Sequence, residues 1–259
     1  METNERRHPE LVLSNEEAHK KLGNKTRRSF LVGAAATAAG LGFYKWVTSA
    51  GDADGVPWPQ RRVLDANGRL AHSYLSDSHL MPTYSPAQIG GVKPNGDIGL
   101  GQPLNYAHWH MEAVSEGMKE RTRFTLADIQ ALPKVEMITK FCCIEGWSGV
   151  AHWGGARFSD FTRHFLGPNT PVPPYVYMAT ADEEYYVGLD SKSALHPQTL
   201  LAYEQNGKPL EERRGAPLRL VIPVKYGIKN IKRIGLIQYM NDRPGDYWAE
   251  EGYDWFAGL

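Results

Sequence analysis

The chain has 259 residues, of which 42% are hydrophobic and 22% charged, and it contains 26 Gly and 17 Pro. These proportions are ordinary for a globular protein and exclude collagen, a long coiled coil and wholesale disorder. Its 29 basic and 29 acidic residues divide unevenly, with a net charge of +3 in residues 1–50 and −3 in residues 51–259. A mildly acidic body is a poor match for a phosphate backbone, so no nucleic-acid partner is expected.

The first 50 residues carry the features of an export signal. A pair of arginines, Arg27 and Arg28, precedes a small-residue apolar stretch from Val32 to about Tyr44. Thr-Ser-Ala at 48–50 is a small-x-small cleavage sequence. The pattern resembles a twin-arginine signal, and the alternative is an amphipathic or buried helix with a basic start. The apolar stretch alone is too short to predict a membrane span.

This resemblance implies recognition by the twin-arginine export machinery and a periplasmic location, with retention at the inner membrane if the signal stays uncleaved. The twin-arginine route carries folded proteins, typically because a cofactor was inserted in the cytoplasm. We therefore expect residues 1–50 to be a signal and residues 51–259 to be one domain that binds a redox cofactor.

Within the body, residues 51–104 are rich in Pro, Gly, Asp and Ser without clear periodicity, which predicts an irregular wrap over the domain. Short helices are expected at 126–132, capped by Thr125, and at 158–166. Asn206-Gly207 predicts a tight turn. Short strands with few helices predict an α+β fold; the expected strands are 135–141, 175–180, 184–189, 200–204, 218–224 and 231–240.

The two cysteines, Cys142 and Cys143, are adjacent and follow a predicted strand, so no disulfide framework is expected. A thiolate is a soft ligand for a redox metal or a nucleophile, although a free cysteine is often only a small buried apolar residue. In an extended chain Cys143 and Glu145 lie on one face and Cys142 on the other. Trp147, His152 and Trp153 follow and are candidates for the entrance of a pocket, with core packing as the alternative.

A basic segment at 216–232 ends in a glycine turn. Arg219, Lys225, Lys229 and Lys232 beside Gly227 have the charges and backbone N–H groups to hold a phosphate. The alternative is a solvated basic turn.

Two histidines, His108 and His110, are separated by one residue and suggest a zinc site shared with a cysteine. No third and fourth ligands stand at convincing spacing, so this alternative is the weaker one.

Longer motifs resemble a known family. The sequence Cys-Ile-Glu-Gly-Trp-Ser at 143–148, continued by Val150, Trp153 and Gly154, resembles the molybdenum-ligating segment of the sulfite oxidase superfamily. The segment 216–232 resembles that family's phosphate-binding signature. Residues 196–215 resemble the stretch of chain that precedes this signature in the family. The resemblance spans roughly residues 105–240 and is strongest to the bacterial branch of periplasmic sulfoxide reductases. It implies an α+β, sulfite-oxidase-type molybdopterin-binding domain with mixed sheets and few short helices.

Site residues follow from the resemblance position by position. Cys143 is expected to ligate molybdenum. Independently of the resemblance, Glu145 lies on the same face as Cys143 if the chain stays extended, and we expect it to tune or protonate the reacting oxygen; the alternative is a carboxylate paired with a nearby Arg or Lys. Arg214 stands where relatives carry Asn or His, a departure that leaves its contact with the pterin open. The expected cofactor contacts are Asn105, His108, Trp109, Cys143, Thr180, Arg214, Arg219, Asn230, Ile231 and Lys232.

The implied activity is a two-electron oxygen-atom transfer at sulfur or nitrogen, with sulfoxide reduction preferred. One mononuclear molybdenum–molybdopterin per chain and no haem in this chain are expected. A membrane haem subunit or a soluble cytochrome would supply electrons, and the substrate would be a small-molecule or protein sulfoxide. Only 19 residues follow Met240, too few for the immunoglobulin-like dimerisation domain of sulfite oxidases, so a monomer is expected.

Three alternatives stay open. One is a sulfite-dehydrogenase-like oxidase, which an arginine-rich anion site beside the metal would favour. Another is a non-catalytic binding protein with Cys143 unmetallated, and the third is a thiol peroxidase that uses Cys143 as nucleophile.

Overall fold

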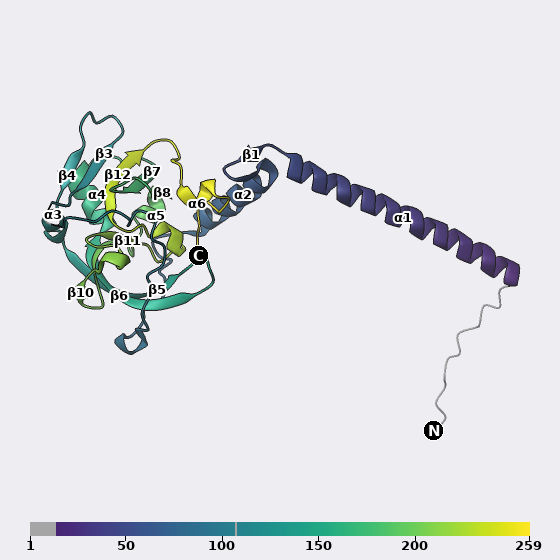
Figure 1. The fold of residues 1–259 in the computed structure, drawn as a ribbon, viewed down its shortest axis with the longest axis horizontal. Coiled ribbons are helices and arrows are strands. Elements are labelled where there is room, and N and C mark those ends of the chain that lie inside the picture. The colour runs from purple at the N-terminus through teal and green to yellow at the C-terminus, as the bar shows by residue number, and fades with distance from the viewer. Residues whose placement is uncertain (1–13, 107) are drawn as a thin grey trace, which may run out of the picture. The chain divides into compact units, whose positions relative to one another are not determined.

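The computed structural model describes residues 14–106 and 108–259, so residues 1–13 of the predicted signal lie outside the described residues. The chain divides into two compact units, Met1–Gly51 and Asp52–Leu259 (Figure 1). The division falls close to the boundary expected between signal and body, and each unit is described separately.

The N-terminal unit contains α1 (Asn15–Ser49), which begins in a capping box formed by Ser14 and Glu17. The helix continues through Arg27 and Arg28 and through the apolar stretch that follows. By length and composition the helix can cross a membrane, which differs from the expectation drawn from its apolar stretch alone.

The second unit begins with a short hairpin, β1 (Asp52–Ala53) and β2 (Val56–Pro57), and then α2 (Trp58–Tyr74). The expectation of an irregular wrap over residues 51–104 is wrong for this 17-residue helix. Gly68 lowers the helix propensity of the segment in isolation. In the fold it is a packing position, because a Cβ there would lie 3.2 Å from Phe256 Cβ. From Leu75 to His110 the described chain is largely irregular, with one 3₁₀ turn, η1 (Pro86–Gln88).

Two five-stranded sheets form the body (Figure 1). The first has the order β4-β3-β12-β7-β8, in which β12 is parallel to β3 and antiparallel to β7. Its strands are β3 (Met111–Ser115), β4 (Thr122–Phe124), β7 (Tyr175–Thr180), β8 (Tyr186–Asp190) and β12 (Ile234–Met240).

The second sheet has the order β10-β9-β6-β5, and β11 also pairs with β9. Its strands are β5 (Lys134–Cys142), β6 (Ser148–Arg157), β9 (Leu200–Gln205), β10 (Lys208–Pro209) and β11 (Arg219–Val221). The remaining short helices are α3 (Leu126–Gln130), α4 (Phe158–Leu166), α5 (Ser191–Ala194), η2 (Glu212–Arg214), η3 (Gly227–Lys229) and α6 (Tyr247–Glu250). Mixed sheets with few short helices confirm the α+β prediction.

β6, the strand that follows the cysteine turn, was not predicted from the sequence, because its glycines and histidine hide the alternating pattern. Its glycines allow close approach of the backbone. A Cβ at Gly155 would lie 2.2 Å from the carbonyl oxygen of Leu201, and one at Gly149 would lie 2.3 Å from that of Gly91. Small residues therefore let β9 and the chain near residue 91 pack directly on β6.

Residues of β6, β9 and β11 contribute to a small apolar cluster, separate from the main core. Trp153 is fully buried in it, and the Arg219 guanidinium lies over its ring at 5.0 Å from the centroid. Trp153 is therefore a core residue and does not form an entrance. His152, also considered for the entrance, lies 3.7 Å from a carboxylate oxygen of Glu136.

Two buried lysines beside Gly227 bond to residues of the C-terminal segment, here residues 246–256. Lys229 Nζ donates to the Gly188 carbonyl oxygen at 2.9 Å and pairs with Asp246. Lys225 Nζ donates to the Phe256 carbonyl oxygen at 2.7 Å and lies 3.4 Å from Asp190. Both ammonium groups are thus engaged in structural contacts, which corrects the expectation that they help to hold a phosphate.

Replacement of Asp246 by asparagine tests the Lys229 contact. The introduced amide can keep the N-cap bond to the Ala249 N–H, but its NH₂ group would face the Lys229 ammonium and the Gly188 N–H. We expect Asp246→Asn to lower the free energy of unfolding in urea by about 3–5 kcal/mol, because a buried cation loses its counter-charge. Glu136→Gln, at a half-exposed ion pair with Lys134, should change it by less than about 1 kcal/mol. Equal effects of the two substitutions would contradict a buried pair.

Candidate functional site

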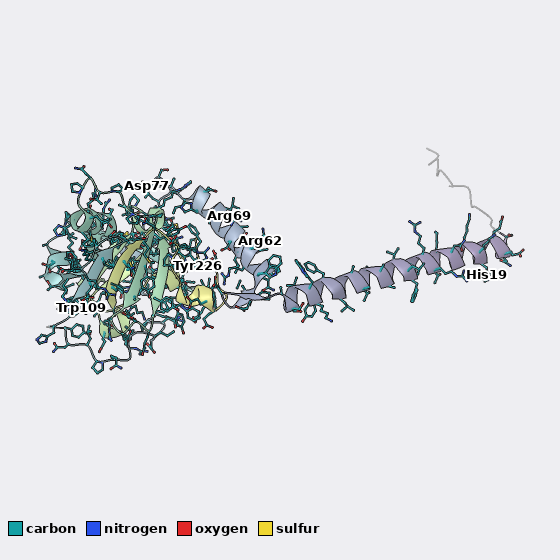
Figure 2. The ribbon with its side chains drawn as sticks, turned by 90° about the horizontal axis from the view of Figure 1, so that it is seen from above. His19, Arg62, Arg69, Asp77, Trp109 and Tyr226 are labelled. Carbon is teal, nitrogen blue, oxygen red and sulfur yellow. The ribbon has the colours of Figure 1, made fainter. Side chains whose placement is uncertain are left out.

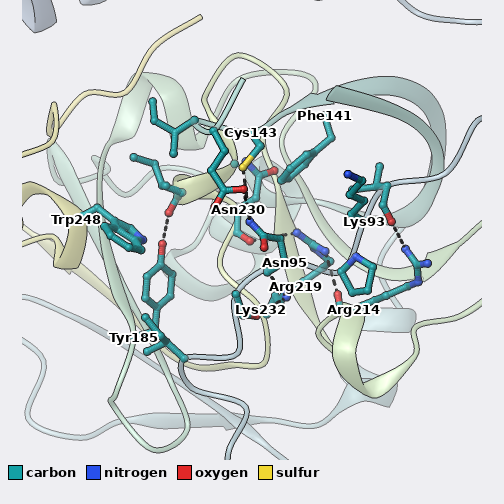
Figure 3. A pocket seen from close by; sticks show the side chains of 18 of the residues that line it. Lys93, Asn95, Phe141, Cys143, Tyr185, Arg214, Arg219, Asn230, Lys232 and Trp248 are labelled. Carbon is teal, nitrogen blue, oxygen red and sulfur yellow. Dashed lines mark hydrogen bonds between the residues drawn. The ribbon is translucent and has the colours of Figure 1, made fainter. Parts of the chain in front are cut away.

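A pocket opens between the end of β5 and the segment 92–98. Residues of the stretch 205–232, the C-terminal residues Trp248 and Tyr253, and Tyr185 complete its lining (Figure 3). It contains about 960 Å³ of empty space, the open solvent at its mouth included. This size is typical of sites for small molecules and cofactors.

Cys143 lies in this pocket immediately after β5. Cys142 ends the strand, paired with Ser148, and is not among the residues that line the cavity. Cys143 is 8% exposed, and its N–H donates to the Trp147 carbonyl oxygen at 2.9 Å. The chain then turns, with Gly146 at φ 88° and its N–H bonded to the Cys143 carbonyl oxygen at 3.1 Å. The premise that residues 143–145 stay extended is therefore wrong, although Glu145 still lines the same pocket as Cys143.

An asparagine that the sequence analysis missed connects the thiol to the carboxylate. Asn95 Nδ2 donates to Cys143 Sγ at 3.8 Å and to Glu145 Oε2 at 3.2 Å. Trp147 Nε1 donates to the same carboxylate oxygen at 3.0 Å. Lys232 Nζ in turn donates to the carbonyl oxygens of Asn95 and Gly96, at 2.6 and 2.8 Å. The lysine thus holds the loop that places an amide between the two groups.

Positively charged side chains outnumber negatively charged ones in the lining of the pocket. Lys93, Arg214, Arg219 and Lys232 line the pocket, and Glu145 is the one acid among its lining residues. Arg219 donates to the carbonyl oxygens of Arg214 and Asn230, at 2.9 and 3.2 Å. Arg214 donates to the Val92 carbonyl oxygen at 2.6 Å and pairs with Glu211 at 3.1 Å. Clustered cations held mainly by carbonyl groups suit an anionic ligand.

Burial and mutual repulsion act on these cations. Burial, with a smaller contribution from Arg214, lowers the pKa of Arg219 to about 10. Burial, followed by the charge of Arg219, lowers the pKa of Lys232 to about 8. A bound anion would offset both effects.

The remaining lining fits an elongated polar group. Gln205 Nε2 is buried and, within the described residues, has no hydrogen-bond partner, while Gln205 itself lines the pocket. Gly227 borders the cavity against Phe141, where a Cβ would lie 2.5 Å from the ring. Tyr185, whose hydroxyl donates to the Ile228 carbonyl oxygen, and Trp248 complete the wall (Figure 3). An unused donor, four cations and a thiol together fit a phosphate-bearing cofactor with a soft metal.

The predicted contacts divide between two places. Cys143, Glu145, Arg214, Arg219, Asn230 and Lys232 line this pocket. Ile231 is fully buried in the main core and does not line it, so the structure does not support a contact by its side chain.

A second, more open cavity collects the other predicted residues, Asn105, His108, Trp109 and Thr180. These four residues do not line the pocket that contains Cys143, and their contact with the pterin stays a prediction. Gly99 packs closely against Thr180, because a Cβ on Gly99 would lie 2.5 Å from Thr180 Cγ2. The segment 92–98, read in sequence as part of an irregular wrap, occupies the position beside the thiol instead.

The zinc alternative has no ligand set in residues 14–106 and 108–259, where no group of three or more His, Cys, Asp or Glu side chains is arranged to hold a metal ion. His110 Nδ1 lies 3.3 Å from the carbonyl oxygen of His108.

Comparison with known families agrees with this geometry. Residues 100–248, more than half of the chain, match the family described as "Oxidoreductase molybdopterin binding domain". The chain belongs to this family of the sulfite oxidase superfamily, which confirms the predicted fold. It is a molybdopterin-dependent oxidoreductase.

Curated relatives are similar over much of their length. The chain is 34% identical over 186 residues to the "Putative protein-methionine-sulfoxide reductase subunit YedZ1" of Azospira oryzae, covering 68% of this chain and 70% of the relative. It is 31% identical over 203 residues to the "Protein-methionine-sulfoxide reductase catalytic subunit MsrP" of Campylobacter jejuni, covering 71% and 68%. These relatives agree with the predicted resemblance to bacterial sulfoxide reductases.

Among solved structures, the sulfane dehydrogenase SoxCD of Paracoccus pantotrophus matches with a TM-score of 0.48 and 16% identity. The match covers 55% of this chain and 40% of that one. The family assignment rests on the sequence matches alone.

The lowered pKa of Lys232 gives a prediction for the cofactor-free protein. Lys232 is protonated below about pH 8 and loses its charge above it. Sulfate, which stays a dianion in this range, should therefore bind about five- to ten-fold more weakly at about pH 9 than at about pH 7.5 in isothermal titration. Lys232→Met should remove most of this pH dependence, whereas Lys119→Met, at an exposed lysine outside the pocket, should keep it. A parental slope in Lys232→Met would show that another group controls anion binding.

Proposed function

We propose that this chain is a periplasmic sulfoxide reductase that carries one mononuclear molybdenum–molybdopterin cofactor. The observation that carries the proposal is the thiol of Cys143 in a cation-lined pocket, linked through Asn95 to the carboxylate of Glu145. The family and the printed names of the relatives support the same reaction class.

In this proposal Cys143 supplies the thiolate to the metal, a role that suits a soft sulfur ligand. Arg219, Lys232 and the Asn230 amide hold the phosphate end of the pterin, and Arg214 and Gln205 donate to its polar edge. When bound, the cofactor supplies two-electron oxygen-atom transfer chemistry. The overall reaction takes a sulfoxide, two electrons and two protons to a thioether and water.

The chain's own contribution is orientation and proton handling. Asn95 Nδ2 and Trp147 Nε1 both donate to Glu145 Oε2, which fixes the carboxylate beside the thiol. In the described part of the chain no hydrogen bond to Glu145 Oε1 is found, so this oxygen is available for a proton of the reaction. We assign Glu145 the transfer of a proton to the oxygen that leaves the sulfoxide.

The same carboxylate favours a sulfoxide over sulfite. A dianion such as sulfite would be repelled by Glu145, while a neutral sulfoxide would not. The pocket also has apolar and aromatic side chains in its lining, which suit the carbon groups of a sulfoxide. They belong to Ile98, Ile144, Trp248 and Tyr253. In this proposal the two arginines of the pocket, Arg214 and Arg219, bind the pterin and its phosphate, so they do not form the anion site beside the metal that would favour a sulfite dehydrogenase.

The chain itself supplies no haem in this proposal, and the electrons come from a membrane haem subunit or a soluble cytochrome. The twin-arginine pair in α1 supports export of the folded protein, and the length of α1 is compatible with a signal sequence or an anchor. We propose a monomeric catalytic subunit that accepts small-molecule or protein sulfoxides.

A turnover assay tests this function. Protein exported by a host that makes the cofactor should oxidise reduced benzyl viologen with methionine sulfoxide as acceptor. Cys143→Ala should lower kcat by more than about 100-fold, because the metal loses its protein ligand. Cys142→Ala should retain parental activity.

Other outcomes select among the alternatives. Oxidation of sulfite by ferricyanide, without sulfoxide reduction, would support the dehydrogenase. Peroxide reduction by protein from a molybdenum-starved host, abolished by alkylation, would support the thiol peroxidase. Absence of all three activities in metal-loaded protein would leave the non-catalytic binding protein.

The Glu145 assignment has its own prediction. Glu145→Gln keeps an oxygen to accept from Asn95 and Trp147 but removes the proton-transferring carboxylate. We expect kcat to fall by about 100-fold with KM changed by less than about three-fold. Glu120→Gln, at an exposed residue outside the pocket, should behave like the parent. A raised KM with unchanged kcat would show that Glu145 only binds substrate.

A further inference from the structure

The outward face of α2 exposes large apolar side chains beside arginines. Val63, Leu70 and Tyr74 are 60%, 71% and 69% exposed and follow one another at intervals of seven and four residues. That spacing places all three on one stripe of the helix. The buried residues of the helix are Arg61 and Gly68. The helix thus turns an apolar stripe to the outside while it packs on the body through other positions.

Cationic and aromatic residues border this stripe. Arg62 and Arg69 are exposed, each one position before a stripe residue, so they lie along the same edge (Figure 2). Trp58 is 39% exposed, and the Arg62 guanidinium lies 5.8 Å from the centroid of its ring. Asp65, the one carboxylate in the helix, is paired with Arg243 at 3.0 Å on the side toward the body. The exposed face therefore combines positive charge, tryptophan, tyrosine and aliphatic groups.

This combination is typical of helices that lie in the headgroup region of a membrane. Trp and Tyr place an apolar ring and a polar edge at that depth, and arginine reaches anionic headgroups from a partly inserted helix. A water-facing helix of a soluble domain has no comparable reason to expose this set together.

The chain brings α2 close to a membrane by its connectivity. Eight residues, 50–57, separate the end of α1 from the start of α2. Fully extended they span about 27 Å, and the β1–β2 hairpin shortens this reach. When α1, the one described helix long and apolar enough to cross a membrane, is inserted, the start of α2 is within this reach of the end of α1.

The same helix is fixed to the wall of the pocket. Arg61 donates to the carbonyl oxygens of Ala249 and Tyr253, at 2.6 and 2.9 Å. Tyr253 and Trp248, on either side of Ala249, line the pocket that contains Cys143. An immobilised α2 would therefore set the direction in which the pocket faces.

We propose that the exposed face of α2, formed by Trp58, Arg62, Val63, Arg69, Leu70 and Tyr74, lies in the anionic headgroup layer of the membrane that holds α1, and thereby orients the pocket relative to that membrane. The proposal is independent of which substrate the pocket reduces. Its partner is the lipid surface itself.

Tryptophan quenching in nanodiscs tests this placement. The full chain is reconstituted in nanodiscs of phosphatidylethanolamine and phosphatidylglycerol, with acyl chains brominated near the headgroup. The quenched fluorescence of the parent minus that of Trp58→Phe isolates the contribution of Trp58 from that of the other tryptophans. We expect this difference to be present, and to fall at least two-fold when phosphatidylcholine replaces phosphatidylglycerol.

Charge reversal tests the role of the arginines. Arg62→Glu and Arg69→Glu are introduced together into the parent and into Trp58→Phe, and the Trp58 contribution is again the difference between the two. We expect the double reversal to reduce this contribution at least two-fold. Arg163→Glu, at an exposed arginine on α4, should leave it unchanged. Near-ultraviolet circular dichroism identifies variants that fold as the parent does; if the double variant misfolds, each single reversal is measured instead.

Equal quenching of the parent and Trp58→Phe in anionic nanodiscs would overturn the proposal. So would a Trp58 contribution that requires a membrane subunit in the disc, since α2 would then dock on protein. Failure of sulfoxide reduction would leave this test unaffected.

Discussion

The site depends on one arginine that is buried without a carboxylate partner. In the described part of the chain no acid pairs with Arg219; its guanidinium donates to three carbonyl oxygens and lies over the Trp153 ring. Isolating a cation in this way is unfavourable unless other groups or a ligand offset the loss of water. The tight packing of β6 on β9, made possible by Gly155, positions the aromatic ring that supports it. The second sheet therefore buries the positive charge of Arg219, which a bound anion would stabilise.

Much of the fold follows from local sequence signals. α4 and β7 have the predicted bounds, and the Thr125 capping box begins α3 as expected. Runs of β-branched and aromatic residues determine the strands locally, and a capping hydroxyl determines where α3 begins. α2 and β6 escaped prediction because their glycines serve distant packing partners, which no local pattern reveals.

The site residues likewise divide into those that a continuous motif predicts and those that depend on contacts between distant parts of the chain. The cysteine segment and the basic segment are continuous motifs, so Cys143, Arg219, Asn230 and Lys232 can be assigned from sequence to one pocket. Asn95 cannot, because its contact with Cys143 joins residues 48 positions apart. Lys225 and Lys229 look equivalent to Lys232 in sequence, yet their ammonium groups are used to fasten the C-terminal segment. Only the tertiary structure distinguishes Lys232, which lines the pocket, from Lys225 and Lys229, whose buried ion pairs stabilise the fold.

The central claim is that Cys143 joins a molybdenum cofactor to this chain. Molybdenum per chain, measured by plasma mass spectrometry on exported protein together with the sulfur coordination number from X-ray absorption, tests it most directly. We expect about one molybdenum per chain in the parent and in Cys142→Ala, with three sulfur ligands, two from the pterin dithiolene and one from Cys143. In Cys143→Ala we expect one fewer sulfur ligand or loss of the metal. Absence of molybdenum from parent protein made in a cofactor-competent host, or an unchanged sulfur count in Cys143→Ala, would contradict it.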